Sequence, residues 1–217
     1  MTPAVTLPYH SGIAFVLEGV TEKVFYQEYL EWCCRGTDGA AMERLPDKDY
    51  VVHVGNKATL VKFNVMGSVS SIPNATAWVQ KTCKESSLTS WTVVLCYDTD
   101  GNSSLSLNTR AWQRFRQDLK AMHLPVIDLA ADADIEDVML ADLDGVRRYL
   151  GLPSDVLPRG KKGKSKLNSL FKVADITRPY HEAERARDLI RHLDFAAIEE
   201  RAPMDLARLH CALMSEG

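Results

Sequence analysis

Acidic residues follow two apolar segments of the sequence at the points where these segments end. Glu18 ends the first segment, with Glu22 one helical turn later, and Asp98 and Asp100 follow the apolar run 92–97. Carboxylates two positions apart on an extended chain point the same way, so Asp98 and Asp100 can share one ion. Carboxylates that gather without a cation repel one another, a conflict that a divalent cation removes. Because oxygen-only ligands favour Mg²⁺ or Mn²⁺ over zinc, the pattern predicts a site for one of these ions.

A third group of acids follows the apolar segment 125–129. In open parallel sheets ligands bind at the carboxyl ends of the strands, so this group is expected at the same edge as the first two. A single acid after a strand is usually a helix cap or a solvated loop residue, and the prediction therefore depends on the three groups together. The third group consists of Asp132, Asp134, Glu136 and Asp137.

Positive charge is concentrated after residue 144. Residues 145–192 contain 12 Lys and Arg against 5 Asp and Glu, whereas residues 1–144 contain 12 against 19. A basic segment beside an acidic body favours a polyanion such as DNA or RNA as the partner. The basic segment has few aromatic residues, which argues against base stacking as the main binding mode. These aromatic residues are Tyr149, Phe171 and Tyr180, and the candidate nucleic-acid-binding residues are Arg159, Lys161, Lys162, Lys164 and Lys166.

Apolar periodicity predicts the elements that position these residues. Continuous or alternating apolar runs indicate strands, and apolar residues three and four apart indicate amphipathic helices. Strands alternate with helices up to residue 150, which predicts an α/β fold with a mainly parallel sheet flanked by helices. The expected strands are 12–17, 50–54, 59–65, 92–97 and 125–129, the expected helices are 21–32, 75–84, 108–122 and 135–150, and residues 35–48 are expected to form a loop. Residues 59–65 either pair with 50–54 as a hairpin or continue that strand.

Predicted strands stop after Gly151, and the rest of the chain is expected to be a helical C-terminal extension. A loop over residues 152–166 holds the lysine cluster. We therefore expect a catalytic domain over residues 10–150 and a basic loop with helices over residues 151–217. The helical segments expected in this second part are 167–172, 179–193 and 204–214.

The composition is typical of a globular protein. Hydrophobic residues make up 46% and charged residues 25% of the 217 residues, which excludes disorder as a whole-chain state. No apolar run approaches the ~20 residues of a membrane helix, and no signal peptide is apparent. The five cysteines form no Cys-x-x-Cys motif and are expected to be reduced, buried thiols. These features predict a cytoplasmic protein that has no membrane partner.

Two of the acidic motifs resemble those of a known family. The segment 15–25, Phe-Val-Leu-Glu-Gly-Val-Thr-Glu-Lys-Val-Phe, resembles the first motif of the toprim domain, and the segment 95–100, Leu-Cys-Tyr-Asp-Thr-Asp, resembles its Asp-x-Asp motif. Together with the Ile-Glu-Asp element at 135–137, the order is most similar to OLD-type (overcoming lysogenization defect) nucleases and to small standalone toprim proteins of bacterial defence systems. The resemblance covers about residues 12–140 and implies a Rossmann-like toprim sheet.

The resemblance also implies a role for each matching residue. Glu18 matches the glutamate that acts as general acid/base or metal ligand in toprim enzymes. Asp98 and Asp100 match the pair that binds Mg²⁺. The resemblance further implies that Glu22, and Glu136 or Asp137 as a later acid, are candidate metal ligands of the OLD type. It also implies that Lys164 or Lys166 stabilises charge on the phosphate.

These features predict a divalent-metal-dependent endonuclease that hydrolyses phosphodiester bonds of DNA or RNA, and the resemblance implies a role in bacterial anti-phage defence. An alternative is a toprim effector or binding subunit that is inactive alone and regulated by a partner ATPase, because OLD-type nucleases usually carry an ATPase. A less favoured alternative is a dehalogenase-like phosphatase, whose nucleophile motif residues 98–102 resemble. That family normally carries this motif on its first strand, and Glu18 would then have no role.

Overall fold

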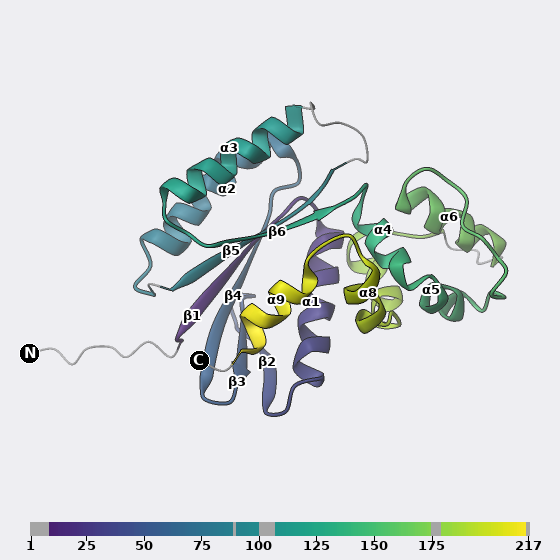
Figure 1. Cartoon of the computed structure of the whole chain (residues 1–217), viewed down its shortest axis with the longest axis horizontal. Coiled ribbons are helices and arrows are strands. Elements are labelled where there is room, and N and C mark those ends of the chain that lie inside the picture. The colour runs from purple at the N-terminus through teal and green to yellow at the C-terminus, as the bar shows by residue number, and fades with distance from the viewer. Residues whose placement is uncertain (1–8, 89, 100–106, 175–178, 216–217) are drawn as a thin grey trace, which may run out of the picture.

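The computed structural model describes residues 9–88, 90–99, 107–174 and 179–215. Up to residue 150 the chain combines strands with helices, with three consecutive strands over residues 40–65, and helices follow (Figure 1). Among the described residues, no helix has the length and the apolar character needed to cross a membrane. The strands and helices are, in order, β1 (Ser11–Leu17), α1 (Val20–Arg35), β2 (Ala40–Arg44), β3 (Tyr50–Val54), β4 (Lys57–Val65), α2 (Ile72–Val79), β5 (Trp91–Asp98), α3 (Leu107–Ala121), β6 (Val126–Ala131), α4 (Ile135–Met139), α5 (Leu143–Leu150), α6 (Gly163–Val173), α7 (Arg187–Arg191), α8 (Phe195–Arg201) and α9 (Leu206–Met214).

The strands form one mixed sheet in the order β2-β3-β4-β1-β5-β6. β1 runs parallel to β4 and β5, and β5 runs parallel to β6, while β2, β3 and β4 pair in antiparallel fashion. The structure thus confirms an α/β fold with a mostly parallel sheet flanked by helices. It also shows that the segment 59–65 pairs with 50–54 as a hairpin.

Helices cover both faces of the sheet. α2 and α3 lie on one face, and α1 lies on the other together with C-terminal helices (Figure 1). Successive residues of the central strand β1 point to opposite faces: Ala14 and Val16 belong to the core beneath α2 and α3, and Phe15 and Leu17 to the core beneath α1. Burial on both faces explains the continuous apolar sequence of β1 and fixes the position of its carboxyl end.

The helices after residue 150 share a continuous hydrophobic core with α1. Phe195 of α8 packs against Phe25 of α1, with ring centroids 5.4 Å apart. The buried carboxylate of Glu28 in α1 forms ion pairs with Arg187 and Arg191 of α7. The C-terminal part of the chain therefore helps to cover one face of the sheet. The expected division at residue 150 stays a prediction.

The structure contains one strand that the sequence pattern does not predict. β2 (Ala40–Arg44) lies within the segment 35–48, which was expected to be a loop. It is an edge strand whose residues are half-buried or exposed. Because none of its residues is fully buried, its sequence lacks the apolar run by which the other strands, including the opposite edge strand β6, were recognised.

The helix expected over residues 135–150 is divided into α4 and α5. A short 3-10 turn at Leu140–Asp142 separates them. The buried Asp142 carboxylate accepts a hydrogen bond from the N–H of Gly145 at 2.9 Å and another from the N–H of Asp194 at 2.7 Å. The second bond comes from 52 residues away, and helical periodicity does not reveal such a contact.

Candidate functional site

Glu18 and Asp98 lie side by side at the carboxyl edge of the sheet. Their strands, β1 and β5, are parallel neighbours, with Leu17 opposite Cys96. The N–H of Asp98 donates a hydrogen bond to Oε2 of Glu18 at 3.3 Å. Parallel pairing therefore brings together two acids that are 80 residues apart in the sequence.

Glu22 lies in the first turn of α1 and faces the same site, with 6% of its surface exposed. A Cβ atom at Gly19 would lie 2.7 Å from Oε2 of Glu22, so the missing side chain at position 19 leaves room for this carboxylate. Burial raises the pKa of Glu22 to about 7, with a smaller contribution from the negative charge of Glu18. Glu22 is therefore poised to change its charge near neutral pH.

Asp98 has the most perturbed carboxylate of the site. Burial raises the pKa of Asp98 to about 8, and the charges of Glu22 and Glu18 add to the effect. Its Oδ1 atom is buried and has no hydrogen-bond partner among the described residues. A buried polar oxygen without a partner costs free energy, so this atom calls for a proton or a cation. The oxygen-only donor set around it fits Mg²⁺ or Mn²⁺.

Glu136 of α4 joins these acids. It is 3% exposed and lines the same pocket as Glu18 and Asp98. The hydroxyl of Tyr180 donates a hydrogen bond to Oε1 of Glu136 at 2.8 Å. Burial raises the pKa of Glu136 to about 7. Of the two later acids that the sequence left open, Glu136 is the one that the structure brings to the site.

Asp137, the other match, faces α6 instead. It accepts hydrogen bonds from the N–H of Gly163 at 2.9 Å and from Nζ of Lys166 at 2.5 Å. Asp134 caps α4 and also accepts a hydrogen bond from the N–H of Lys164 at 3.2 Å. A Cβ atom at Gly163 would lie 2.1 Å from the backbone nitrogen of Asp137, so only glycine allows this approach. The first turn of α6 thus docks onto α4 and carries the lysine cluster to the acids.

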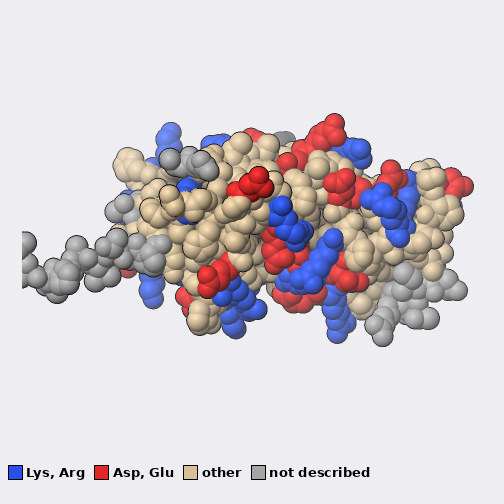
Figure 2. Space-filling model, turned by 90° about the horizontal axis from the view of Figure 1, so that it is seen from below, with Lys and Arg blue, Asp and Glu red and all other residues tan. Residues whose placement is uncertain are grey.

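Two adjoining pockets meet at these acids. The acidic pocket has a volume of about 350 Å³, and its lining includes Glu18, Glu22, Asp98, Glu136 and Glu182. The lysine pocket has a volume of about 650 Å³, shares Asp98, Glu136 and Glu182 with the first, and adds Asp134, Lys161, Lys162 and Lys164. Figure 2 shows Asp and Glu side chains in the middle of the face seen from below, with Lys and Arg side chains directly beside them. A carboxylate-rich hollow therefore opens into one lined by lysines.

The two candidate catalytic lysines occupy different positions. Nζ of Lys164 lies 2.8 Å from Oε1 of Glu182, and Lys164 lines the lysine pocket. Lys166 forms an ion pair with Asp137 and lines neither pocket. The structure therefore brings Lys164, and not Lys166, to the acids.

The other predicted basic residues also differ in whether they line the lysine pocket. Lys161 and Lys162 line the lysine pocket. Arg159 lies outside it, with its backbone N–H bonded to Oγ of Ser169 at 2.7 Å. Glu182, which lines both pockets, was missed by the sequence analysis because it follows no strand. Its one sequence signal is that it is an acid within a basic segment.

Asp100, the second residue of the predicted Asp-x-Asp pair, lies outside the described residues. Within the part of the chain that the structure describes, no three His, Cys, Asp or Glu side chains are grouped closely enough to hold a metal ion. The predicted metal site therefore stays a prediction, and one of its predicted ligands, Asp100, is not among the residues that can test it.

A comparison with models of known protein families found no match, and a search of curated proteins found none either. What this site does therefore has to follow from its own residues. These are buried carboxylates with raised pKa values, beside a pocket lined by lysines.

Proposed function

We propose that this protein is a divalent-metal-dependent endonuclease that hydrolyses phosphodiester bonds of DNA or RNA. The observation that carries the proposal is the buried Oδ1 atom of Asp98, which lacks a hydrogen-bond partner among the described residues. Asp98 lines both the acidic and the lysine pocket. A cation at the carboxylates and a phosphate at the lysines would satisfy the two groups of charges together.

The proposed ligands of Mg²⁺ or Mn²⁺ are Glu18, Glu22, Asp98 and Asp100, with Glu136 beside them. When bound, the ion would activate a water molecule and offset the charge that develops on the phosphoryl oxygens. Glu18 is also the proposed general acid/base. Ligand carboxylates must be deprotonated, so the raised pKa values of Asp98 and Glu22 make metal affinity increase with pH.

Lys164 is the residue proposed to contact the scissile phosphate. Its present partner Glu182 is an exposed carboxylate, and an exposed ion pair contributes little to stability. A phosphate can therefore replace Glu182 at small cost. Lys161 and Lys162 are proposed to hold neighbouring phosphates, which makes the affinity fall with increasing salt.

The toprim resemblance supports the same proposal. Its two motifs fall on β1 and β5, which are neighbours in the sheet, and their acids Glu18 and Asp98 meet at one edge. The proposed biological context is that of OLD-type nucleases, namely anti-phage defence in the bacterial cytoplasm.

A cleavage assay with the purified full chain tests the proposal. Plasmid, linear DNA, tRNA and ribosomal RNA are incubated with the wild type in Mg²⁺, Mn²⁺ or EDTA. Asp98→Asn keeps the size of the side chain and removes its charge, and we expect it to lower the rate by at least about 100-fold. Asp155→Asn alters an exposed loop acid outside both pockets and should cleave like the wild type.

Cleavage that persists in EDTA, or that Asp98→Asn supports at the wild-type rate, contradicts the proposal. If the wild type cuts none of the polymers, the proposal is wrong for the isolated chain. The alternative of an effector that is regulated by a partner protein then remains. Hydrolysis of p-nitrophenyl phosphate that depends on Asp98, without cleavage of any polymer, would identify a dehalogenase-like phosphatase instead.

A further inference from the structure

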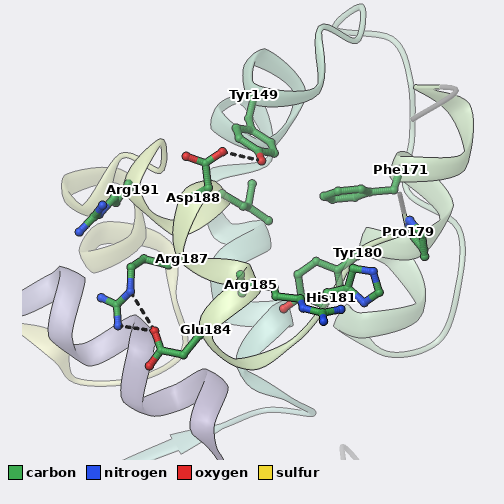
Figure 3. Close-up of a pocket in the computed structure, with 12 residues that line it drawn as sticks. Tyr149, Phe171, Pro179, Tyr180, His181, Glu184, Arg185, Arg187, Asp188 and Arg191 are labelled. Carbon is green, nitrogen blue, oxygen red and sulfur yellow. Dashed lines mark hydrogen bonds and ion pairs between the residues drawn. The ribbon is translucent and has the colours of Figure 1, made fainter. Parts of the chain in front are cut away.

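A third cavity lies between α5, α6 and the segment 179–191 (Figure 3). Its volume of about 580 Å³ is in the range of small-molecule sites. Three aromatic side chains from separate parts of the chain line it: Tyr149, Phe171 and Tyr180. The ring centroid of Phe171 lies 6.5 Å from that of Tyr149 and 5.7 Å from that of Tyr180. We call this cavity the aromatic pocket.

The arginines around the aromatic pocket differ in their partners. Arg187 and Arg191 are held by the carboxylate of Glu28 in α1. Arg185, which is exposed, makes no hydrogen bond or ion pair with the described residues. Figure 3 shows Arg185 near His181, on the side of the pocket formed by the segment 179–191. Among the described residues, Arg185 is therefore the lining arginine whose charge has no protein partner.

One short segment forms a wall of both the aromatic pocket and the acidic pocket. Glu182 and Ala183 line the acidic pocket, whereas His181 and Glu184 on either side of them line the aromatic pocket. The N–H of Ala183 donates a hydrogen bond to Oγ1 of Thr21 at 2.9 Å, which attaches this segment to α1. A single chain segment therefore separates the two pockets.

Tyr180 connects the pockets directly. Its ring lines the aromatic pocket, and its hydroxyl donates the hydrogen bond to Glu136 in the acidic pocket. A ligand in the aromatic pocket therefore lies one side chain away from the acids.

We propose that the aromatic pocket binds a nucleobase whose attached phosphate contacts Arg185. Aromatic rings accept any base, because every base has a π-face that can stack, and a guanidinium group suits a phosphate. If the base belongs to the cleaved strand, the pocket holds it next to the scissile phosphate, and the inference then rests on the proposed nuclease function. A free nucleotide presents the same base and phosphate.

The tertiary structure changes the significance of the three aromatic residues. The basic segment has only the aromatic residues Tyr149, Phe171 and Tyr180, and this small number argued against base stacking as the main binding mode. The fold brings all three to one cavity. One such pocket holds one base and does not require an extended stacking surface along the strand.

The test measures quenching of 2-aminopurine, a fluorescent base whose emission falls when it stacks. The full chain is titrated in EDTA, so that cleavage plays no part, with 2-aminopurine riboside monophosphate and with a short single-stranded oligonucleotide that contains one 2-aminopurine. We expect the wild type to quench the oligonucleotide, the free nucleotide, or both. If both probes are quenched and bind with similar affinity, the pocket is a nucleotide site. If the oligonucleotide alone is quenched, the pocket is a subsite for the cleaved strand.

Two variants probe the pocket. Phe171→Leu removes a ring and keeps apolar volume, and Arg185→Gln removes the exposed charge without touching the core. Each is expected to weaken binding by at least about fivefold. Val173→Ala in α6 and Arg201→Gln in α8 alter exposed residues outside the pocket and should bind like the wild type. Because Arg185 is exposed, its variant decides the question even if Phe171→Leu fails to fold.

The proposal is overturned if the wild type quenches neither probe, or if Arg185→Gln binds both probes like the wild type. Its failure is distinguishable from failure of the proposed function. Quenching by a chain that cuts no polymer overturns only the nuclease proposal, and cleavage without quenching overturns only the nucleobase pocket.

Discussion

The hydroxyl of Tyr180 donates a 2.8 Å hydrogen bond to Glu136, 44 positions earlier in the sequence. Both side chains are buried, and Glu136 lines the acidic pocket with Glu18 and Asp98. Through this bond the C-terminal part of the chain, which also contributes Glu182 to the acidic pocket, orients an acid that comes from the first 140 residues. The bond also favours the charged form of Glu136 and so opposes the effect of burial on its pKa.

Replacing Tyr180 with Phe is expected to remove this bond and little else. The pKa of Glu136 should rise further, and the free energy of unfolding should fall by about 1–3 kcal/mol, because a buried carboxylate loses its donor. Urea denaturation of the metal-free protein measures the loss. In Tyr149→Phe, the lost bond is to Asp188 at an exposed position, and the change should stay below about 1 kcal/mol. Equal losses in the two variants would contradict a special role for Tyr180.

The metal-free protein is expected to lose stability as the pH rises. Folding raises the pKa of Asp98 from 3.8 to about 8, and those of Glu22 and Glu136 from 4.5 to about 7. At a pH between the unfolded-state and the folded-state pKa values, the folded state binds more protons than the unfolded state. The free energy of unfolding therefore decreases as the pH rises. Thermal unfolding in EDTA should therefore have a lower midpoint at about pH 8.5 than at about pH 5.5. Asp98→Asn removes one of the three titrating groups, so its midpoint should fall less between these two pH values. If its midpoint falls as much as that of the wild type, Asp98 does not contribute to the pH dependence.

Glu28 and Glu31 lie in the same helix but are expected to differ in their contribution to stability. Glu28 is buried and forms ion pairs with Arg187 and Arg191, whereas Glu31 forms an exposed pair with Arg35. Glu28→Gln should lower the free energy of unfolding by about 2–3 kcal/mol, because it weakens hydrogen bonds to charged groups at a buried position. Glu31→Gln should cost less than about 1 kcal/mol. Urea titrations of the two variants check the difference, and similar values would show that the attachment of α7 to α1 does not depend on Glu28.

Lys164 and Lys166 are expected to act in different ways. Lys164→Gln should lower the cleavage rate by about tenfold or more and leave the midpoint of thermal unfolding unchanged, because its partner Glu182 is exposed. Lys166→Gln should lower the midpoint, because Lys166 ties α6 to Asp137 in α4, and should affect cleavage less. Rates and midpoints measured on the same preparations check this. A larger loss of cleavage in Lys166→Gln would reverse the assignment.

Local sequence determined the strands and the acids at their ends. The apolar, β-branched run 92–97 became β5, and Glu18 directly follows the apolar run that became β1. In a parallel sheet the carboxyl ends of neighbouring strands meet at one edge. The parallel-sheet inference and the toprim resemblance together predicted that the acids share this edge, and the pairing of β1 with β5 in the structure places Glu18 beside Asp98. β2 escaped prediction because none of its residues is fully buried, whereas the opposite edge strand β6 buries apolar residues and was predicted.

Only the tertiary structure decided which side chains face the site. Glu136 and Asp137 are consecutive, yet one lies in the acidic pocket and the other against α6. Gly163 of α6 packs against α4 on the side of Asp137, so Asp137 faces α6. The same contact sets which side of α6 presents Lys164 to the acids. The same long-range packing brings Glu182 to the acids and gathers three separated aromatic residues in one cavity. The spacing of apolar residues indicates which face of a helix or strand is buried. Which other helix or strand packs against that face depends on contacts between residues far apart in the sequence.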